Sequence, residues 1–589
     1  MITLTDEQTA FLDAEGKVIL CACPGSGKTF IVGKKLLKYL ETWPYVYRGV
    51  AVLSFTNVAS EEILRQTKEL TEANYLNIGY PHFIGTLDSF INAFIFLRFG
   101  YLATEENRRR PKVVYENLGQ LLYPKEECHR NGCADNLDWF HWSDDRLLKK
   151  GKPISCAVRE PKPCVRFKKA MLGRGYATQR EVPALSLQLL KKYPQIAREI
   201  VYRFPVIMVD EAQDTSREQM EIIELLAEKG AITVVIVGDP DQAIYEWRDA
   251  TPEYFKRKLI DAQWEPLYLT ANFRSSQHIC SATAKFSATL SKNKPAEAMG
   301  EHSDYDTKPI LLHVNSENTP GDVIDWFKQL CNRNGINPEG VSVAILTRGR
   351  IHSNTDIANL WQTNETHLLA LATYHWYCES RKEAYAQCEK ALFYMMIGDA
   401  NGLSAEDMKQ IIENTMEYST WKHKVILLLS LLPDARSALK DWKSLLIEKL
   451  EELKQQGVIS IFGSRNITEI IKLKTRDKNK NDKSFSTEFL DSPLQTYFEK
   501  RTTIGTTYST VHGVKGESFD ATLLMVRGNK GNTITPSLLD AGKLDSELMR
   551  IAYVAMTRPR KLLAVSIPKQ DARDMLNRFP LDLWDHQEI

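Results

Sequence analysis

The chain of 589 residues contains no run that approaches the roughly 20 consecutive apolar residues needed to span a bilayer, so we expect no membrane contact. Residues 1–8 lack the basic and then apolar order of a secretion signal, which leads us to expect a cytoplasmic protein. Cysteine is sparse, and the 10 residues mostly stand singly, as reduced thiols do. A hydrophobic content of 43% and a charged content of 26% exclude a mostly disordered or fibrous chain.

Net charge is also nearly absent, because 76 Lys and Arg residues are balanced by 75 Asp and Glu residues. The balance is uneven along the chain. Residues 101–200 carry 20 basic and 12 acidic side chains, a local charge of +8, and the remainder carries −7. Such asymmetry predicts a nucleic-acid contact surface joined to a neutral or acidic body. A basic solvated face without a partner would give the same counts.

What the sequence does contain begins near its start. Residues 17–21 form a short apolar run that predicts a buried parallel strand, and residues 22–29 read Ala-Cys-Pro-Gly-Ser-Gly-Lys-Thr. This pattern is a phosphate-binding loop with alanine at its first position. Its glycines let backbone N–H groups turn toward phosphates at the positive end of the following helix. We expect Lys28 to reach the β and γ phosphates and Thr29 to ligate Mg²⁺, within a nucleotide-binding set of Ala22, Gly25, Ser26, Gly27, Lys28 and Thr29.

Two adjacent acids follow a second buried strand. Residues 205–209 are apolar and lead directly into Asp210 and Glu211. Ligands of parallel α/β sheets bind at the carboxyl ends of the strands, so these acids should face the phosphates. Asp210 would hold Mg²⁺, and Glu211 would orient and deprotonate the attacking water. The alternative is an acidic cap at a helix N-terminus.

A third strand is predicted over residues 232–237, and it leads into Gly-Asp-Pro-Asp-Gln. Gln242, at the end of that segment, can sense a γ phosphate with its side-chain amide. Tyr245 and Trp247 follow and offer flat faces for base stacking. Aromatic side chains beside such a site also occur as ordinary core residues.

Taken in order, these three segments resemble motifs I, II and III of superfamily 1A helicases of the UvrD, Rep and PcrA type. Further segments resemble the remaining motifs of that family in the correct order, from the Q motif to motif VI: residues 4–8, 53–57, 85–90, 271–276, 344–348, 510–516 and 550–558.

The resemblance implies cofactors, a DNA partner and site residues. The cofactors would be ATP and Mg²⁺. Gln8 would read adenine, Phe273 would stack on it, Arg274 would contact the γ phosphate, and Arg558 would be the arginine finger. The implied catalytic residues are Lys28, Glu211, Gln242, Arg274 and Arg558, and the implied contacts with DNA are Phe55, Asn57, Thr86, Tyr245, Trp247 and His512.

The resemblance also implies an α/β fold with two RecA-like domains, each built on a parallel sheet and interrupted by a mostly helical insertion. The first domain would comprise residues 1–90 and 200–272, with a basic, DNA-binding insertion over 91–199. The second would comprise residues 273–355 and 501–589, with a helical insertion over 356–500. In the basic insertion, Trp139, Phe140 and Trp142 interleave with basic residues, so we expect them to stack on bases.

Three features depart from the family or stand outside it. After Lys515-Gly516 the family has Leu-Glu-Phe, whereas residues 517–519 are Glu-Ser-Phe, which displaces or replaces an acid that contacts the nucleotide sugar in relatives. Pro559 follows Arg558, and a helix starting there would begin at the proline. The basic insertion also contains a cluster of possible metal ligands: Cys128, His129, Cys133, Cys156 and Cys164. Their spacing is not that of common zinc sites, so ordinary reduced thiols are the alternative to a metal site.

Two functions are compatible with this pattern. The first is an ATP-dependent helicase or translocase that moves 3′ to 5′ on single-stranded DNA, acts on DNA junctions, and serves repair or genome defence. The second is a helicase-like ATPase that senses DNA termini and regulates a partner nuclease of the OLD family, as in Gabija-type anti-phage complexes. The divergent helical insertion and the altered segment 517–519 favour the second modestly.

Overall fold

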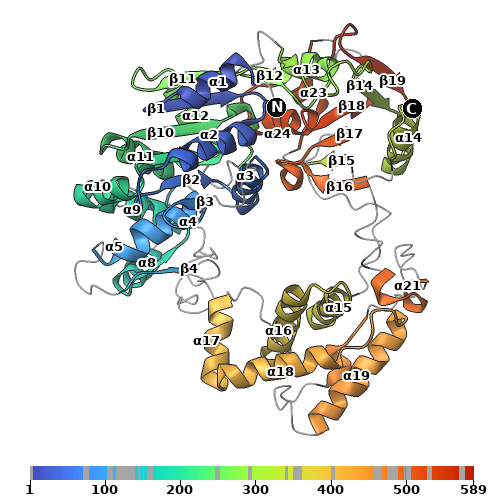
Figure 1. The fold of residues 1–589 in the computed structure, drawn as a ribbon. Coiled ribbons are helices and arrows are strands. Elements are labelled where there is room, and N and C mark those ends of the chain that lie inside the picture. Colours follow the sequence, from blue (N-terminus) through green and yellow to red (C-terminus); the bar gives the residue numbers. More distant parts are fainter. Residues whose placement is uncertain are drawn as a thin grey trace. The chain divides into compact units, whose positions relative to one another are not determined.

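The computed structural model describes residues 4–70, 78–102, 110–114, 140–143, 146–149, 152–154, 163–245, 252–289, 295–338, 342–348, 361–398, 405–455, 466–473, 488–496, 498, 506–526, 533–569 and 577–589. The chain divides into two units (Figure 1): Met1–Ile351 with Thr506–Ile589, and His352–Gly505.

The first unit contains a six-stranded parallel sheet in the order β11-β1-β10-β9-β2-β3. Its strands are β1 (Lys17–Ala22), β2 (Val50–Ser54), β3 (Phe83–Thr86), β9 (Val206–Val209), β10 (Thr233–Gly238) and β11 (Glu265–Leu269). Alternate side chains of β1 enter two different cores, with Val18 and Leu20 on one face of the sheet and Ile19 and Cys21 on the other. This sheet is therefore covered on both faces, as the continuous apolar runs of its strands predict.

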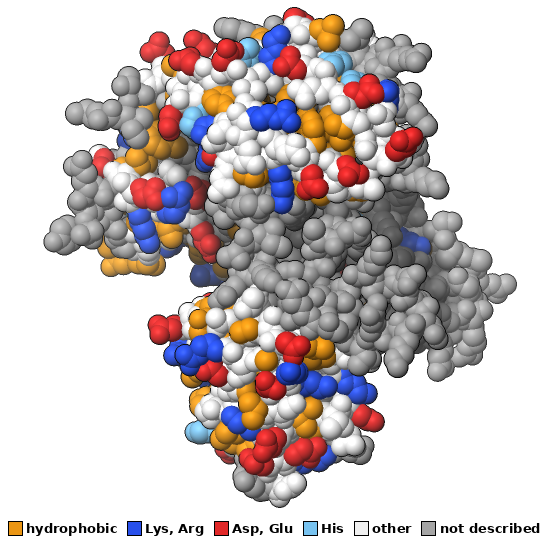
Figure 2. Space-filling view, turned by 90° about the vertical axis from the view of Figure 1, so that its right-hand side faces the viewer, with side chains coloured by type: hydrophobic (Ala, Val, Ile, Leu, Met, Phe, Trp, Pro, Cys, Tyr) orange, Lys and Arg blue, Asp and Glu red, His pale blue; other side chains and the backbone are white. Residues whose placement is uncertain are grey.

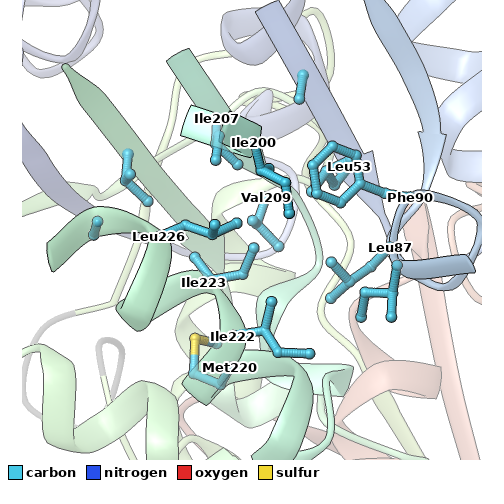
Figure 3. Close-up of a cluster of buried hydrophobic side chains, with 14 of the residues drawn as sticks. Leu53, Leu87, Phe90, Ile200, Ile207, Val209, Met220, Ile222, Ile223 and Leu226 are labelled. Carbon is cyan, nitrogen blue, oxygen red and sulfur yellow. The ribbon is translucent and has the colours of Figure 1, made fainter. Parts of the chain in front are cut away.

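Helices from different parts of the chain cover those two faces. α1 (Asp6–Asp13), α2 (Lys28–Thr42) and α3 (Asn57–Glu69) contribute to one core. α4 (Leu87–Ile91), α9 (Val182–Lys192), α10 (Pro194–Arg203) and α11 (Arg217–Glu228) contribute to the other. Figure 3 shows this second core, where Leu53 and Val209 from the strands meet Phe90 of α4 and Ile223 of α11. The packing fixes the carboxyl ends of β1, β2 and β9, which is where the predicted site residues follow.

A second six-stranded parallel sheet, in the order β16-β15-β17-β18-β14-β19, completes this unit. Its strands are β14 (Ile310–Val314), β15 (Val343–Thr347), β16 (Thr506–Thr510), β17 (Phe519–Met525), β18 (Pro559–Pro568) and β19 (Asp585–Glu588). α14 (Pro320–Arg333) packs on one face, and α13 (Gln277–Thr283) and α24 (Glu547–Met556) pack on the other. The α/β fold with two parallel sheets is thus confirmed.

The second unit is helical in its described residues and has its own hydrophobic core. Its longer helices are α15 (Asn364–Tyr377), α16 (Arg381–Ile397), α17 (Ala405–Thr415), α18 (Tyr418–Leu431) and α19 (Leu439–Gln455). Two buried tryptophans keep their polar atoms satisfied, because Trp421 donates to Glu389 Oε1 (3.1 Å) and Trp442 donates to Thr373 Oγ1 (3.2 Å). Among the helices of the described ranges, none has the length and apolarity to cross a bilayer.

Charge is dispersed on the face shown in Figure 2. Among the described residues visible there, Lys and Arg side chains alternate with Asp and Glu side chains. The described part of this view therefore shows no continuous basic surface of the kind that tracks a nucleic-acid backbone.

The basic insertion differs from the expectation in its aromatic side chains. Phe140 of β5 (Phe140–Ser143) is 3% exposed and Trp142 is 8% exposed, and both pack with Leu147 of β6 (Arg146–Lys149). The prediction that they stack on bases is wrong for these two residues, because their rings fill a small local core. Trp139 lies outside the described residues.

Lys168, in the second half of the same insertion, lies in α8 (Pro163–Gly173) and is buried, where its Nζ contacts Glu181 Oε1 at 3.0 Å. It is therefore not available to a phosphate. The expected boundary at residue 199 falls inside α10, whose Ile196 and Ile200 belong to the core of the first sheet. Of the cysteine cluster, Cys164 is buried in the small core with Phe140, and its other members lie outside the described residues.

Candidate active site

The phosphate-binding loop joins β1 to α2 and adopts its shape through two glycines in the left-handed region. Their φ angles are 76° at Gly25 and 78° at Gly27. Gly27 is the N-cap of α2 and no side chain caps the helix, so its first N–H groups are open to an anion. Lys28 and Thr29 are the first two residues of that helix. Ser26 Oγ is buried and has no hydrogen-bond partner within the described residues.

Gln8 lies beside this loop. It is buried in α1, where it forms a capping box with Thr5. A Cβ atom at Gly27 would lie 3.8 Å from Gln8 Nε2. The structure thus brings the side chain of Gln8 to the loop.

Residues 272–274 pack directly against the loop from the other side. The Phe273 N–H donates to the Gly25 carbonyl (2.8 Å), and Asn272 Nδ2 donates to the Pro24 carbonyl (2.9 Å). Asn272 Oδ1 accepts from the Arg274 N–H (2.7 Å). A Cβ atom at Gly25 would lie 2.8 Å from both Asn272 Oδ1 and Arg274 Cβ, so only glycine permits this approach. Asn272 was assigned no role from the sequence, yet it holds Arg274 beside the loop.

The two acids follow β9, as predicted. The Asp210 N–H donates to the Leu53 carbonyl (2.8 Å), and Asp210 Oδ1 accepts from the Glu211 N–H (2.9 Å). Asp210 Oδ2 is buried and unpartnered within the described residues. Burial and the negative charge of Glu211 raise the pKa of Asp210. Glu211 itself has a φ of 53°, a left-handed conformation that is uncommon for a residue other than glycine.

Glu211 is surrounded by groups that favour its charged form. Gln213 Nε2 donates to Glu211 Oε2 (2.6 Å), and Lys515 Nζ lies 3.6 Å from the same oxygen. Burial works against ionisation, but the positive charges of Lys515 and Lys28 outweigh it and lower the pKa of Glu211. A carboxylate held in this form can accept a proton.

Two arginines on the side of the second sheet contact this group of residues. Arg558 Nη2 donates to Gln242 Oε1 (2.7 Å), and Gln242 Nε2 donates to Asp239 Oδ2 (2.6 Å). Arg274 Nη1 donates to the carbonyl of Thr557 (3.0 Å). Lys28, Glu211, Gln242, Arg274 and Arg558, which lie far apart in the sequence, therefore lie around one site.

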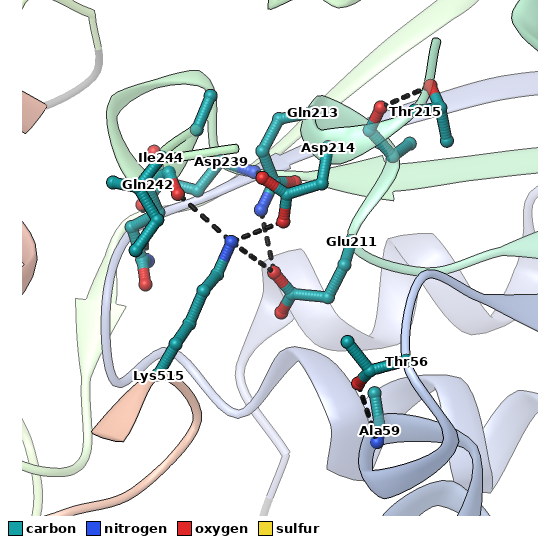
Figure 4. Close-up of polar contacts among 12 residues, drawn as sticks. Thr56, Ala59, Glu211, Gln213, Asp214, Thr215, Asp239, Gln242, Ile244 and Lys515 are labelled. Atoms are coloured by element: carbon teal, nitrogen blue, oxygen red, sulfur yellow. Dashed lines mark hydrogen bonds and ion pairs between the residues drawn. The ribbon is translucent and has the colours of Figure 1, made fainter. Parts of the chain in front are cut away.

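Lys515 lies in a segment that resembles motif V, but its sequence context indicates no role for it. It follows the short 3-10 helix after β16, and its Nζ contacts Asp214 Oδ2 and the carbonyl of Gln242 (3.0 Å) as well as Glu211 (Figure 4). Asp214 is 1% exposed, and burial with the charge of Glu211 raises its pKa to about 6. The only sequence signal for Lys515 is its place in the segment 510–516.

The side chains of this site fit a nucleoside triphosphate with Mg²⁺. Burial and the nearby charges of Arg558 and Arg560 lower the pKa of Arg274, but a guanidinium remains charged at neutral pH. An anion between these groups would relieve their repulsion. The orphaned Asp210 Oδ2 and Ser26 Oγ are the buried oxygens that a metal ion and a phosphate would satisfy.

Three of the predicted DNA contacts form a row of rings. The Phe55 and Tyr245 ring centroids lie 5.1 Å apart, and those of Tyr245 and His512 lie 5.8 Å apart. His512 Nε2 donates to the carbonyl of Ile244 (2.9 Å), and Lys515 Nζ lies 5.0 Å from the centre of the Tyr245 ring. We call Phe55, Tyr245 and His512 the aromatic row.

Two further predicted DNA contacts, Asn57 and Thr86, lie at the carboxyl ends of the neighbouring strands β2 and β3. Asn57 is exposed in the first turn of α3, just after β2. Thr86 is the last residue of β3 and caps α4 by accepting from the Ser89 N–H (3.1 Å). Trp247 lies outside the described residues.

The two departures from the family pattern have plain structural outcomes. Glu517 is exposed, and its carbonyl rather than its carboxylate faces Arg558 Nη1, at 3.4 Å. Pro559 is the first residue of β18, so it begins a strand and not a helix. A proline is tolerated at the first position of a strand.

Comparison with known proteins gives one matching domain model and several similar proteins, most of which are named as helicases. Residues 4–125 and 164–263 match the UvrD/REP helicase N-terminal domain. The Gabija protein GajB of Bacillus cereus (strain VD045) is 27% identical over 311 residues, which cover 51% of this chain and 54% of GajB. A probable DNA helicase of Mycoplasma pneumoniae is 23% identical over 377 residues, 59% of this chain and 68% of that protein.

DNA helicase II of Haemophilus influenzae is 26% identical over 323 residues, which cover 51% of this chain and 43% of the helicase. The matched region thus spans about half the length of GajB and less than half of DNA helicase II. The matches agree with the parallel sheets and with the site built between them, and they make the matched part of the chain similar to UvrD-like helicases.

Proposed function

We propose that the chain binds ATP with Mg²⁺ and couples ATP hydrolysis to 3′-to-5′ movement along single-stranded DNA, with strand separation at junctions. The observation that carries the proposal is the hydrogen bond between Arg558 and Gln242, because it joins the second sheet to the acids of the first at a single site. A nucleotide held by residues from both sheets couples its own chemistry to their relative movement.

Each side chain has a definable task in this proposal. The N–H groups at the start of α2, with Ser26 and Lys28, would hold the phosphates, and Thr29 with Asp210 would hold the metal ion. Mg²⁺, when bound, neutralises phosphate charge. Gln8 and Phe273, which flank the loop, would hold the base.

Glu211 is the proposed general base. Its Oε2 is fixed by Gln213 and Lys515, which leaves Oε1 to accept the proton of a water molecule. The left-handed backbone at Glu211 sets the direction of this side chain. Arg274 and Arg558 would stabilise negative charge that develops on the transferring group, as preorganised cations do at low cost.

The aromatic row supplies the connection to DNA. Gln242 is three residues from Tyr245, and Lys515 contacts both the Gln242 carbonyl and the Tyr245 ring. A shift of Lys515 or Gln242 at the phosphate site therefore changes the position of a ring in the row. Stacking of a base on such rings contributes about 1–3 kcal/mol and does not depend on sequence.

ATP turnover with and without single-stranded DNA tests this proposal. We expect DNA to stimulate ATP turnover severalfold. Lys28→Ala should lose ATP turnover altogether, whereas Tyr245→Ala should keep the turnover measured without DNA and lose only its stimulation by DNA. Tyr268→Ala, an exposed ring on the outermost strand β11, is the matched control and should behave like the wild type. Unwinding of 3′-tailed but not 5′-tailed duplex would establish the direction. Equal turnover with and without DNA would refute the motor.

The similarity to GajB favours a second candidate function. Here the chain would be the ATPase subunit of an anti-phage complex, would sense DNA termini, and would regulate a partner nuclease of the OLD family. A gene for such a nuclease beside this one, and copurification of the two proteins, are the expected results. Processive unwinding by the chain alone, unchanged by the nuclease, would favour the first function.

A further inference from the structure

We infer that the amino-terminal edge of the first sheet is a docking surface for a protein partner that inserts an apolar side chain flanked by carboxylates. The surface consists of six residues, which we call the tyrosine–arginine surface: Tyr45, Tyr47, Arg48, Tyr80, Tyr202 and Arg203. These residues directly precede β2, β3 and β9, whereas the proposed nucleotide site follows the carboxyl ends of the strands. The inference does not depend on the proposed function.

Three tyrosine rings of this surface are exposed to an unusual degree for side chains of their size. Tyr47 is 73% exposed, Tyr80 is 64% exposed and Tyr202 is 65% exposed. Val46, between Tyr45 and Tyr47, is also exposed. Single exposed apolar residues need no explanation, but a contiguous group on one edge marks an interaction site.

Contacts between the three segments show that the group is contiguous and preorganised. Arg48 Nε donates to the carbonyl of Tyr202 (2.7 Å), and its guanidinium lies 4.3 Å from the Tyr45 ring and 4.9 Å from the Tyr202 ring. Arg203 Nη1 donates to the carbonyl of Tyr47 (2.7 Å) and lies over the Tyr80 ring at 5.1 Å. Side chains held in this way lose little entropy on binding.

A cavity of about 610 Å³ opens within this edge. Its apolar lining includes Phe94, Phe99 and the buried Phe204, and the ring centroids of Phe94 and Phe204 are 4.8 Å apart. Arg98 lies over the Phe94 ring at 5.4 Å, and Arg203 lies over the Phe204 ring at 4.7 Å. Phe94 belongs to a π-helical turn, Asn92–Phe96, and such turns occur frequently at functional sites. The cavity thus presents an aromatic lining with two cations beside it.

Charge identifies the occupant. Two arginines, Arg98 and Arg203, line the cavity with one acid, Glu199. Arg48 adds a third positive charge to the tyrosine–arginine surface at the same edge. Burial and the charge of Arg203 lower the pKa of His82, which keeps that ring neutral at physiological pH. A large apolar side chain fits the aromatic lining, and adjacent Asp or Glu residues pair with the arginines.

The composition favours a protein over a nucleic acid. The segments 43–49, 78–82, 94–99 and 199–204 contain no lysine, whereas surfaces that bind phosphate backbones are rich in it. Tyrosine and arginine, by contrast, dominate the energetics of protein interfaces. Each of the three arginines also donates a hydrogen bond to a backbone carbonyl; Arg98 Nε, for example, donates to the carbonyl of Ala93 (3.0 Å).

Selection from a phage-displayed library of random short peptides, with the full chain as bait, tests the inference. We expect the enriched peptides to carry an aromatic or large aliphatic residue beside Asp or Glu. Fluorescence anisotropy should show at least about tenfold weaker binding to Tyr80→Ala and to Arg98→Glu, because loss of an anchor contact costs about 1.4 kcal/mol or more, which is a factor of ten in Kd. Tyr377→Ala and Arg333→Glu, exposed residues elsewhere, are the matched controls and should bind normally.

Two results would overturn the inference. Enriched peptides without acidic residues, or with equal affinity for the wild type, Tyr80→Ala and Arg98→Glu, would exclude the proposed partner. Weaker binding of a fluorescent oligothymidylate to both of these variants would instead assign this edge to nucleic acid. ATP turnover in Tyr80→Ala and Arg98→Glu should equal that of the wild type with or without DNA, so failure of the motor proposal would be seen separately.

Discussion

Lys515 offers the sharpest test of the contacts between the two sheets. Its Nζ lies 3.6 Å from Glu211 Oε2 and also contacts the buried carboxylate of Asp214. At an effective dielectric constant of about 20, two unit charges at that separation attract by about 5 kcal/mol. Desolvation of the lysine offsets part of this. Removal of one partner from a buried pair nevertheless costs about 3–5 kcal/mol, because the remaining charge is left uncompensated.

We therefore expect Lys515→Met to lower the free energy of unfolding of the first unit by about 3–5 kcal/mol, measured from urea curves followed by tryptophan fluorescence. The double variant Lys515→Met with Asp214→Asn should recover part of that loss, since one buried charge is then removed. Lys561→Met is the control, because its contact with Asp520 is partly exposed and 3.9 Å long, and it should change the free energy by less than about 1 kcal/mol.

ATP turnover gives a second readout of the same variant. Without Lys515, the pKa of Glu211 should rise and its carboxylate should lose one of its two fixed neighbours, so turnover should fall more than tenfold. A Lys515→Met protein that unfolds within 1 kcal/mol of the wild type would refute the energetic reasoning. Unchanged turnover would refute the proposed role of Lys515 in holding Glu211.

Three further changes test other parts of the structure. Lys168→Met should destabilise the first unit by about 3–5 kcal/mol in urea unfolding, because it leaves a buried carboxylate without its cation. Gly25→Ala should lower the melting temperature and abolish nucleotide binding, measured by fluorescence titration, because its Cβ would clash with residues 272–274. Gly16→Ala controls for backbone strain alone, because Gly16 has a φ of 83° and its added Cβ would have no neighbour within 4 Å among the described residues. Asp241→Asn should cost about 1–3 kcal/mol in the same unfolding assay, because the Asp241 carboxylate accepts four hydrogen bonds from residues 287–289.

The sequence predicts the parts of this fold that depend on local pattern. The apolar run at 17–21 is β1, and the run at 232–237 is β10 displaced by one residue. The insertion expected over 356–500 is helical in its described residues, and its first two helices, α15 and α16, are separated by a break at residues 378–380. The phosphate-binding loop is also local, since its shape depends on its own glycines and on the helix that follows.

The contacts that build the site could not be predicted in this way. Lys515 and Asp214 are 301 residues apart, and Arg558 and Gln242 are 316 residues apart, so no local pattern pairs them. The burial of Phe140 and Trp142 could not be predicted, because a segment that mixes aromatic and basic residues has the same composition whether its rings fill a small core or lie on the surface. The rings of Tyr45 and Tyr47 do not indicate an interaction surface in the sequence, because only the arrangement of the strands brings them together with Tyr80 and Tyr202.

The arrangement of the strands separates the two proposed sites. β2, β3 and β9 begin beside the tyrosine–arginine surface. At their other ends, β3 finishes at Thr86, and Phe55 and Asp210 directly follow β2 and β9. Strands of four or five residues are about 13–17 Å long, so a partner bound at one edge does not cover the other. A protein partner on the tyrosine–arginine surface would therefore remain bound while the nucleotide site opens and closes. Tyr80→Ala should therefore weaken partner binding at least about tenfold and spare ATP turnover, whereas Lys28→Ala should abolish ATP turnover and spare partner binding. Loss of both properties in either variant would mean that the edges act as one site.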